Sequence, residues 1–398
     1  MSLLSLDQAL IALQEKARLQ PIKEVEQVPV CAALGRVLAE PLIATTDLPP
    51  WANSAMDGYA LRQSDLHTTQ TLVVSQKIFA GHAPQPLQAG TCARIFTGAP
   101  LPAGADSVEM QEHTEVTQQG VRFLQPVTLG QYVRPQGQEC QQGQPLLSQG
   151  TRLSAIDLAL ATSVGVTKVG VYRKYRVALL STGDELVEAG QALQAGQIYN
   201  SNRTLLLTAL TQLGCEVQDI GILPDDPDKI RHVLREINNV DLILSTGGVS
   251  VGEADYLGQI LREEGQLSFW KLALKPGKPL TFGYYKNTAF LGLPGNPASS
   301  LVTFAILARP YILACLQAKN IAPLSFSVTI GFDISQASVR REYLRVRVIQ
   351  GVAQQYDNQC SGVLRSAAWA DGLLVVRENQ CFKQGDQLAF IPFSELFN

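Results

Sequence analysis

Glycines, hydroxyls and carboxylates are concentrated in residues 245–256, STGGVSVGEADY, directly after the apolar run VDLIL. The apolar run is typical of a buried strand, and the glycines leave the following backbone open to an anionic ligand. Gly247 and Gly252 have the spacing of a P-loop, but Glu253 and Ala254 stand where that loop needs Lys and then Ser or Thr. The segment therefore predicts a phosphate site near Gly247 that does not use the nucleoside-triphosphatase arrangement.

Three further strand-like runs end in comparable polar turns. In open α/β sheets, ligands bind outside the carboxyl ends of the strands, which meet at one edge. A single Gly-rich connection from strand to helix is ordinary, but several in one sheet favour a binding site. In the last turn, Asn296 suits a helix N-cap and Pro297 the first helical position. The four turns are STGDE (181–185), LPDDP (223–227), STGGVSVGEAD (245–255) and LPGNPASS (293–300).

Acidic side chains follow the same predicted strands. Two carboxylates about 4 Å apart repel each other by roughly 1 kcal/mol in water and about 4 kcal/mol at an effective dielectric constant of 20. Such a cluster needs a counter-charge, and Mg²⁺ commonly binds one or two carboxylates together with substrate phosphates. The alternative is that each acid only faces solvent or caps a helix, as Asp226 can do before Pro227. The predicted acidic edge comprises Asp184, Glu185, Asp226, Glu253 and Asp255.

The segment FWKLALKPGKP (269–279) contains three lysines. We predict one strand over residues 267–275, in which alternation places Lys271 and Lys275 on the same face. Lys278 follows in a Pro-Gly turn. Two ammonium groups on one face of a covered sheet indicate that this face opens to an anion or to the acids. In the alternative reading, the aliphatic stems are buried and the charged heads reach water.

The rest of the chain divides into regions with different helix-like and strand-like sequence patterns. Residues 5–19 predict an amphipathic helix in which Ser5 and Gln8 form a capping box. Short β-like runs separated by Gly and Pro fill residues 51–140, and β-rich sequence returns after residue 322. Between them, strands alternate with helices from about residue 175 to 316, which predicts a mainly parallel sheet covered on both faces.

Composition narrows the class of protein. The chain has 398 residues, a net charge of −3, 46% hydrophobic and 17% charged residues, which is typical of a globular protein of two to four domains. We expect no nucleic-acid surface, because that requires a basic patch. The seven cysteines form no C-x-x-C pair, and we find no signal peptide and no apolar span of 18 residues. The sequence predicts a soluble, cytoplasmic protein that does not bind a membrane.

Seven stretches in order give the chain a resemblance to the molybdopterin molybdenumtransferase family, and it is also similar to the C-terminal domain of gephyrin. The resemblance extends over essentially the whole chain. Two stretches in the C-terminal region, around Arg345 and Ser366, match loosely. The seven stretches are NSAMDGYA (53–60), IFTGAPLPAGADSV (95–108), LSTGDEL (180–186), GQIYNSN (196–202), STGGVSVGEADY (245–256), KLALKPGKP (271–279) and LGLPGNPASS (291–300).

The resemblance implies a multidomain fold that combines α/β and β units. Its implied parts are an elongated N-terminal domain (1–50 and 141–173), an inserted small β domain (51–140), a molybdopterin-binding α/β domain (174–322) and a C-terminal β-barrel (323–398). It implies a homodimer whose active site combines both subunits. Molybdopterin adenylyltransferase and enzymes that accept the cofactor are its expected partners. The implied reaction converts adenylylated molybdopterin and molybdate, with Mg²⁺, into molybdenum cofactor and AMP.

The family motifs also imply roles for individual residues. Asp184, Glu185 and Asp255 would bind Mg²⁺ or orient phosphates, with Asp226 as a further predicted metal ligand. Lys271 and Lys275 would hold molybdate or developing negative charge, and Asp57 and Thr97 would close the site from the partner subunit. The chain departs from the expected pattern R-x-x-G-x-D, since it carries Glu139 in RPQGQEC. The predicted molybdopterin-binding residues are Gly247, Gly248, Ser250, Lys278, Asn296 and Ser299.

Two other functions fit parts of this pattern. The α/β domain alone would suit an adenylyltransferase that acts on molybdopterin with ATP, or more distantly a metal-dependent nucleotide hydrolase, but about 250 residues lie outside that domain. A non-catalytic dimeric scaffold is the third reading, as the similarity to gephyrin allows. A scaffold could lose the acids and lysines, whereas this chain has them, so the sequence favours the enzyme.

Overall fold

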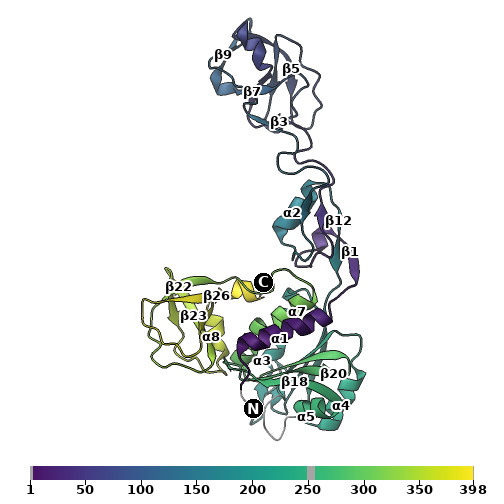
Figure 1. Ribbon diagram of the computed structural model, residues 1–398, viewed down its shortest axis with the longest axis vertical. Helices are drawn as coiled ribbons and strands as arrows, with labels where there is room; N and C mark the ends of the chain where they lie inside the picture. The colour runs from purple at the N-terminus through teal and green to yellow at the C-terminus, as the bar shows by residue number, and fades with distance from the viewer. Residues whose placement is uncertain (1–2, 249–255, 398) are drawn as a thin grey trace.

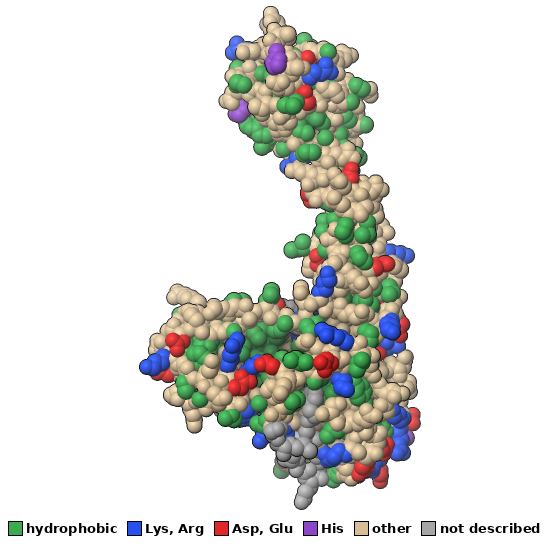
Figure 2. Space-filling view, viewed as in Figure 1, with side chains coloured by type: hydrophobic (Ala, Val, Ile, Leu, Met, Phe, Trp, Pro, Cys, Tyr) green, Lys and Arg blue, Asp and Glu red, His purple; other side chains and the backbone are tan. Residues whose placement is uncertain are grey.

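The protein is an elongated, bent molecule in the computed structural model, which describes residues 3–248 and 256–397 (Figure 1). A small β domain lies at one end and is joined by a narrow stalk to a body that contains an α/β domain and a β-barrel. The space-filling view shows the same narrow connection, with acidic and basic side chains interspersed over the body (Figure 2). The β domain is therefore held well away from the rest of its own chain.

A six-stranded sheet forms the centre of the α/β domain, in the order β16-β13-β17-β21-β20-β18. The first four strands are parallel, β20 pairs antiparallel with β21, and β18 pairs antiparallel with β20 at the edge of the sheet. The predicted mainly parallel sheet is thus confirmed. The strands are β13 (Arg176–Thr182), β16 (Glu216–Leu223), β17 (Leu242–Thr246), β18 (Gly265–Lys271), β20 (Pro279–Tyr285) and β21 (Thr288–Leu293).

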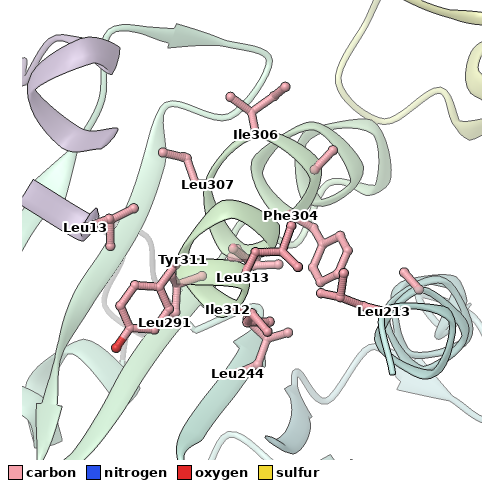
Figure 3. Close-up of a cluster of buried hydrophobic side chains, with 14 of the residues drawn as sticks. Leu13, Leu213, Leu244, Leu291, Phe304, Ile306, Leu307, Tyr311, Ile312 and Leu313 are labelled. Atoms are coloured by element: carbon pink, nitrogen blue, oxygen red, sulfur yellow. The ribbon is translucent and has the colours of Figure 1, made fainter. Parts of the chain in front are cut away.

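Alternating apolar residues along the central strands bury both faces of this sheet. Val177 and Leu179 of β13 pack on one side, among side chains of α1, α3, α6 and α7. Ala178 and Leu180 pack on the other side against α4 and α5. Figure 3 shows part of the first cluster, with Phe304 beside the aliphatic residues. The helices are α1 (Leu6–Leu19), α3 (Ser201–Gln212), α4 (Pro227–Glu236), α5 (Tyr256–Glu264), α6 (Pro297–Thr303) and α7 (Arg309–Cys315).

The helical span Pro297–Cys315 corrects one sequence expectation, because its mean hydropathy of 1.5 makes it apolar enough to cross a membrane. It is 94% buried inside the protein, as the core helix of a soluble protein is. Between α6 and α7 the helix widens into a π turn over Phe304–Ala308. Pro310 has no N–H for the carbonyl four residues back, which accounts for the irregular turn before it.

The N-terminal part of the chain covers the body and builds the stalk. Helix α1 begins after Ser5, and Ser5 and Gln8 form the predicted capping box. In the stalk, β1 (Val25–Pro29) pairs with β12 (Lys168–Tyr172), and β2 (Leu42–Ile43) pairs with β11 (Pro145–Leu147). Helix α2 (Ala155–Ser163) packs beside them, capped by Ser154. The chain therefore leaves the stalk for the β domain and returns to it.

The small β domain contains a six-stranded sheet in the order β7-β4-β6-β5-β9-β8. Its base is the short pair β3 (Asn53–Ser54) and β10 (Val133–Arg134). Gly58 is required in β4, because a Cβ there would lie 1.8 Å from the carbonyl oxygen of Glu109. The sheet strands are β4 (Gly58–Leu61), β5 (Thr71–Ile78), β6 (Thr91–Ile95), β7 (Ser107–Met110), β8 (Thr114–Thr117) and β9 (Gly120–Phe123).

The C-terminal region closes into a five-stranded β-barrel, because β23 pairs with both β24 and β25. This confirms the predicted barrel. Helix α8 (Leu364–Trp369) packs against β23, and α9 (Phe393–Phe397) ends the described chain. The barrel strands are β22 (Phe326–Ile330), β23 (Arg341–Ile349), β24 (Val352–Gln355), β25 (Gly372–Val376) and β26 (Gln387–Pro392).

The predicted single strand over residues 267–275 is wrong. Strand β18 ends at Lys271, and β19 (Leu274–Lys275) instead pairs with β23 of the barrel. Leu272 forms a bridge with Leu4 in the break between them. Two register shifts in β18 also interrupt the alternation on which the prediction rested. Lys271 and Lys275 therefore do not share the face of one strand.

Candidate functional site

A cavity of about 340 Å³ lies at the carboxyl ends of β13, β17 and β21, where the sequence predicted a ligand site. Thr182 ends β13, Thr246 ends β17 and is followed by Gly247, and residues 294–297 follow β21. Asn200 and Asn202 enter from the start of α3, and the wall continues through β14 (Leu186–Val187) and β15 (Ile198–Tyr199). We call this space the asparagine cavity.

Asn202 joins the turns around the asparagine cavity. Its Nδ2 donates to Thr246 Oγ1 at 2.9 Å and to the Gly295 carbonyl oxygen at 2.7 Å. Asn200 caps α3, because its Oδ1 accepts from the Arg203 N–H at 3.1 Å. Sequence reasoning assigned neither asparagine a role. The signal available was the stretch GQIYNSN directly before a helix, in which two amides stand at the helix start.

The glycines after β17 are required by packing. Gly247 and Gly248 have φ values of +85° and +62°. A Cβ at Gly247 would lie 2.5 Å from the Thr182 carbonyl oxygen, and one at Gly248 would lie 2.6 Å from Thr182 Oγ1. The Gly247 N–H donates to the Leu293 carbonyl oxygen at 3.2 Å. That amide is therefore already used within the sheet edge. The predicted residues Ser250, Glu253 and Asp255 lie outside the described part of the chain.

The acidic edge is built differently from the prediction. Asp184 is coupled to Asp225, since each backbone N–H donates to the other's carboxylate, at 3.1 and 3.4 Å. Partial burial, together with the Asp184 charge, raises the pKa of Asp225. Asp226 instead caps α4 by accepting from the Asp228 and Lys229 N–H groups, and it forms an ion pair with Lys229. Glu185 lines the asparagine cavity.

These acids leave a small set of candidate metal ligands. Among the residues that the structure describes, no group of three His, Cys, Asp or Glu side chains converges as a complete metal site. The Asp184 and Asp225 carboxylates still suit Mg²⁺, which takes one or two carboxylates and completes its shell with water and substrate phosphates. Asp225, which sequence reasoning passed over in favour of Asp226, is thus a candidate ligand.

A second cavity of about 790 Å³ lies between the α/β domain and the barrel. Lys275, Lys278 and Arg340 line it, and we call it the basic pocket. Pro279 and Asn296 line both cavities and form the wall that they share. Lys275 Nζ also forms an ion pair with Glu342 Oε1 at 2.9 Å. The predicted residue Ser299 lies in the basic pocket too, whereas Lys271 lines neither cavity.

Arg345 organises the barrel side of the basic pocket. Its side chain is fully buried, with Nε donating to Ser366 Oγ at 3.0 Å and Nη2 to the Cys360 carbonyl oxygen at 3.1 Å. Its backbone N–H donates to Gln359 Oε1 at 3.0 Å. Burial lowers the pKa of Arg345 to about 10. The guanidinium therefore holds the segment that supplies Gln359 and Cys360 to the pocket wall.

Asp57 and Thr97 meet in the β domain. Asp57 Oδ1 accepts from the Thr97 N–H at 2.8 Å and from Thr97 Oγ1 at 2.7 Å, which lowers the pKa of the carboxyl group. The pair lies beyond the stalk, away from both cavities of its own chain (Figure 1). Glu139 is exposed where the chain returns from the β domain, and its N–H donates to the Leu48 carbonyl oxygen.

Comparisons with family models match all three parts of the chain. Residues 4–165 match the MoeA N-terminal region (domain I and II), and residues 327–393 match the MoeA C-terminal region (domain IV). Residues 178–314, which contain the asparagine cavity, match the model described as "Probable molybdopterin binding domain". The three matches define the class as a multidomain protein built around a molybdopterin-binding type α/β domain.

Curated relatives and solved structures agree. A molybdopterin molybdenumtransferase from Haemophilus influenzae is 40% identical over 99% of this chain and 100% of its own length. One from Nostoc sp. is 38% identical over 92% of this chain and 88% of its own. The crystal structure of the molybdopterin biosynthesis moeA protein from Pyrococcus horikoshii OT3 has a TM-score of 0.84, 28% identity, and coverage of 98% and 100%. The chain belongs to the molybdopterin molybdenumtransferase family, and it is a transferase.

Proposed function

We propose that this protein transfers molybdenum from molybdate to molybdopterin, using adenylylated molybdopterin and Mg²⁺ and releasing AMP with the finished cofactor. The observation that carries the proposal is the pair of adjoining cavities that share Pro279 and Asn296. The lining of the first includes neutral polar groups and Glu185, whereas that of the second includes the cations Lys275, Lys278 and Arg340 together with Asp357. A substrate with a polar ring and charged oxygens can occupy both.

The basic pocket supplies the electrostatic part of the reaction. Lys275, Lys278 and Arg340 are positioned to hold an oxyanion and to offset the negative charge that grows as molybdate attacks and AMP leaves. The family resemblance implied that Lys271 and Lys275 both hold molybdate. Lys275 lines the basic pocket and can do so, whereas Lys271 does not line it. Bound Mg²⁺ would neutralise phosphate charge, and Asp184 and Asp225 would hold it.

The remaining residues require a second subunit. We propose a cytoplasmic homodimer in which Asp57 and Thr97 of one subunit close the cavities of the other, because their own chain places them beyond the stalk. The low pKa of Asp57 keeps its carboxylate ionised as a fixed acceptor. The adenylyltransferase that supplies the substrate and the enzymes that accept the cofactor would be the transient partners.

The proposal is tested by measuring AMP release against molybdate concentration with purified protein and adenylylated molybdopterin. AMP should appear only when molybdate and Mg²⁺ are both present. ATP turnover without molybdate would indicate the adenylyltransferase instead. Absence of AMP release under all conditions, with dimers still formed, would favour a scaffold.

A further inference from the structure

The small β domain carries two cations side by side. Lys77 of β5 and Arg94 of β6 are register partners on adjacent strands, so their side chains leave the same face of the sheet. Like charges this close repel each other. Arg122, the other cation in the strands of this sheet, forms an ion pair with Glu115. Among the residues that the structure describes, Lys77 and Arg94 form no ion pair. Their charges are therefore available to an external anion.

Aromatic rings hold both cations in place. Phe79 and Phe96 stack with their ring centroids 4.8 Å apart. Lys77 Nζ lies 5.0 Å from the centroid of Phe79 and 5.4 Å from that of Phe96. Arg94 Cζ lies 4.7 Å from the centroid of Phe96 and 5.1 Å from that of Tyr59. Because cation–π contacts orient a cation without neutralising it, both charges stay able to bind an anion.

The two cations share a surface with Asp57 and Thr97. Arg94 Nη1 donates to the carbonyl oxygen of Gly58, the residue after Asp57, at 3.0 Å. Phe96, which contacts both cations, directly precedes Thr97. The Arg94 charge also helps to lower the pKa of Asp57, after the two hydrogen bonds from Thr97. A site that Asp57 and Thr97 close is therefore approached by Arg94 as well.

The asparagine cavity, which this surface would close in the other subunit, lacks such charges. None of the described residues that line it is Lys or Arg, and Glu185 is its acidic member. The nearest cations described above line the basic pocket, behind the wall formed by Pro279 and Asn296. A phosphate group at the asparagine cavity therefore receives no positive charge from the described lining. A β domain that closes over it would bring two cations.

We infer that Arg94 and Lys77 of one subunit bind phosphate oxygens of the substrate held by the other subunit. Two of the five N–H groups of Arg94 are used by Gly58 and Gln111, so donors remain for an oxyanion. Lys77 adds a second positive charge beside it. The inference rests on the proposed function, and it adds these two cations to the groups that the β domain contributes in trans.

Titration calorimetry with ADP and the full-length protein tests the inference without turnover, because ADP carries the adenylate and a second phosphate. Lys77→Met and Arg94→Gln should each lower ADP affinity about tenfold, since each removes one charged contact to phosphate. Arg94→Lys keeps the charge and should lose less. Arg122→Gln is the matched control, because it removes a positive charge of the same sheet that already pairs with Glu115. Wild-type ADP affinity in Lys77→Met and Arg94→Gln would overturn the inference.

Stability and dimerisation separate this role from two others. Lys77 is exposed, so Lys77→Met should keep the wild-type melting temperature, and a parallel fall in melting temperature and affinity would refute the inference. The cations could instead contact the acids of the other subunit, such as Asp184 and Asp225. Sedimentation would then show weaker dimers whose ADP affinity is unchanged, which would also refute it.

Complementation tests whether the cations act across the dimer. Lys77→Met/Arg94→Gln protein refolded together with Lys275→Ala protein should recover about a quarter of wild-type AMP release, because half of the dimers are mixed and each has one intact site. Absence of recovery in demonstrated mixed dimers would contradict the inference. ADP binding that depends on both cations, without AMP release under any condition, would refute the proposed function alone. Wild-type AMP release by the double variant would refute the inference alone.

Discussion

The α/β domain and the small β domain contain comparable numbers of β-strands, but they treat their polar residues differently. In the α/β domain, the ends of β13, β17 and β21 converge on one cavity, and a buried asparagine ties two of the turns together. In the β domain, Asp57 and Thr97 bind each other at an exposed surface beyond the stalk. The first domain gathers its polar residues around a cavity, whereas the second presents its polar pair on an open surface.

The largest effect is expected from a substitution in the basic pocket, which lies in the body of the molecule. Lys275→Ala should lower AMP release about a hundredfold or more, because a preorganised charge next to the reacting oxyanion is lost. The melting temperature should change little, since the Lys275 side chain is half-exposed and an ion pair made by such a side chain, here with the largely buried Glu342, contributes about 1 kcal/mol.

Arg122→Ala is the control for Lys275→Ala, because it removes an exposed ion pair with Glu115 in the β domain, away from both cavities. It should leave turnover unchanged. If Lys275→Ala loses folding and activity in parallel, Lys275 has a structural role. The proposed electrostatic role of the basic pocket would then lose its main residue.

A smaller effect is expected in the β domain. Thr97→Val removes the hydroxyl donor to Asp57 but keeps the backbone donor. AMP release should fall about tenfold, the usual cost of one hydrogen bond to a charged group, and Thr97→Ser should restore it. The pKa of Asp57 is held down by both donors, so losing one should move the acid limb of the pH–rate profile to higher pH. An unchanged profile would separate Asp57 from the reaction.

Mixing two inactive variants tests whether the regions meet between subunits. Asp57→Asn and Lys275→Ala proteins, unfolded and refolded together, should recover about a quarter of wild-type AMP release. Half of randomly formed C2 dimers are mixed, and each mixed dimer has one intact site. Recovery requires that the two residues act in different subunits. No recovery, with mixed dimers demonstrated, would place both residues in the same chain's site.

The smallest effect is on stability. Burial and the neighbouring charge raise the pKa of Asp225, so the folded state binds its proton more tightly than the unfolded state does. Ionising Asp225 as pH rises through that pKa therefore lowers stability. Asp225→Asn should raise the melting temperature slightly at pH 7 and weaken Mg²⁺-dependent AMP release. A lower melting temperature would show that the Asp184 contact is favourable overall.

The sequence predicted the elements of the fold well, because local signals determined them. Asp226 and Pro227 start α4 as expected, and Ser5 with Gln8 starts α1. The prediction failed at residues 267–275, where tertiary pairing with the barrel overrides an alternation that looks continuous in the sequence. No local pattern distinguishes a strand that stays in one sheet from a strand that changes sheets.

The sequence predicted where the candidate site lies better than it predicted what each of its residues does. Asn296 is at the helix start, as predicted, but its side chain makes no capping bond there and lines both cavities instead. Residue type alone could not distinguish the roles of the adjacent acids Asp225 and Asp226. Asp226 caps α4, whereas Asp225 contacts Asp184. The difference depends on how the turn between β16 and α4 folds. Asn200 and Asn202 were missed because an amide near a helix start normally indicates a cap.

The passage of residues 265–275 from the α/β sheet into the barrel has a mechanical consequence. Lys275 is hydrogen-bonded into the barrel through β23, while Pro279, only four residues later, begins β20 of the sheet. The lysine is thus fastened to one domain and the shared cavity wall to the other. Any tilt of the barrel would change the separation between Lys275 and Pro279. The angle between the two domains therefore sets the distance that a substrate bound in both cavities must span.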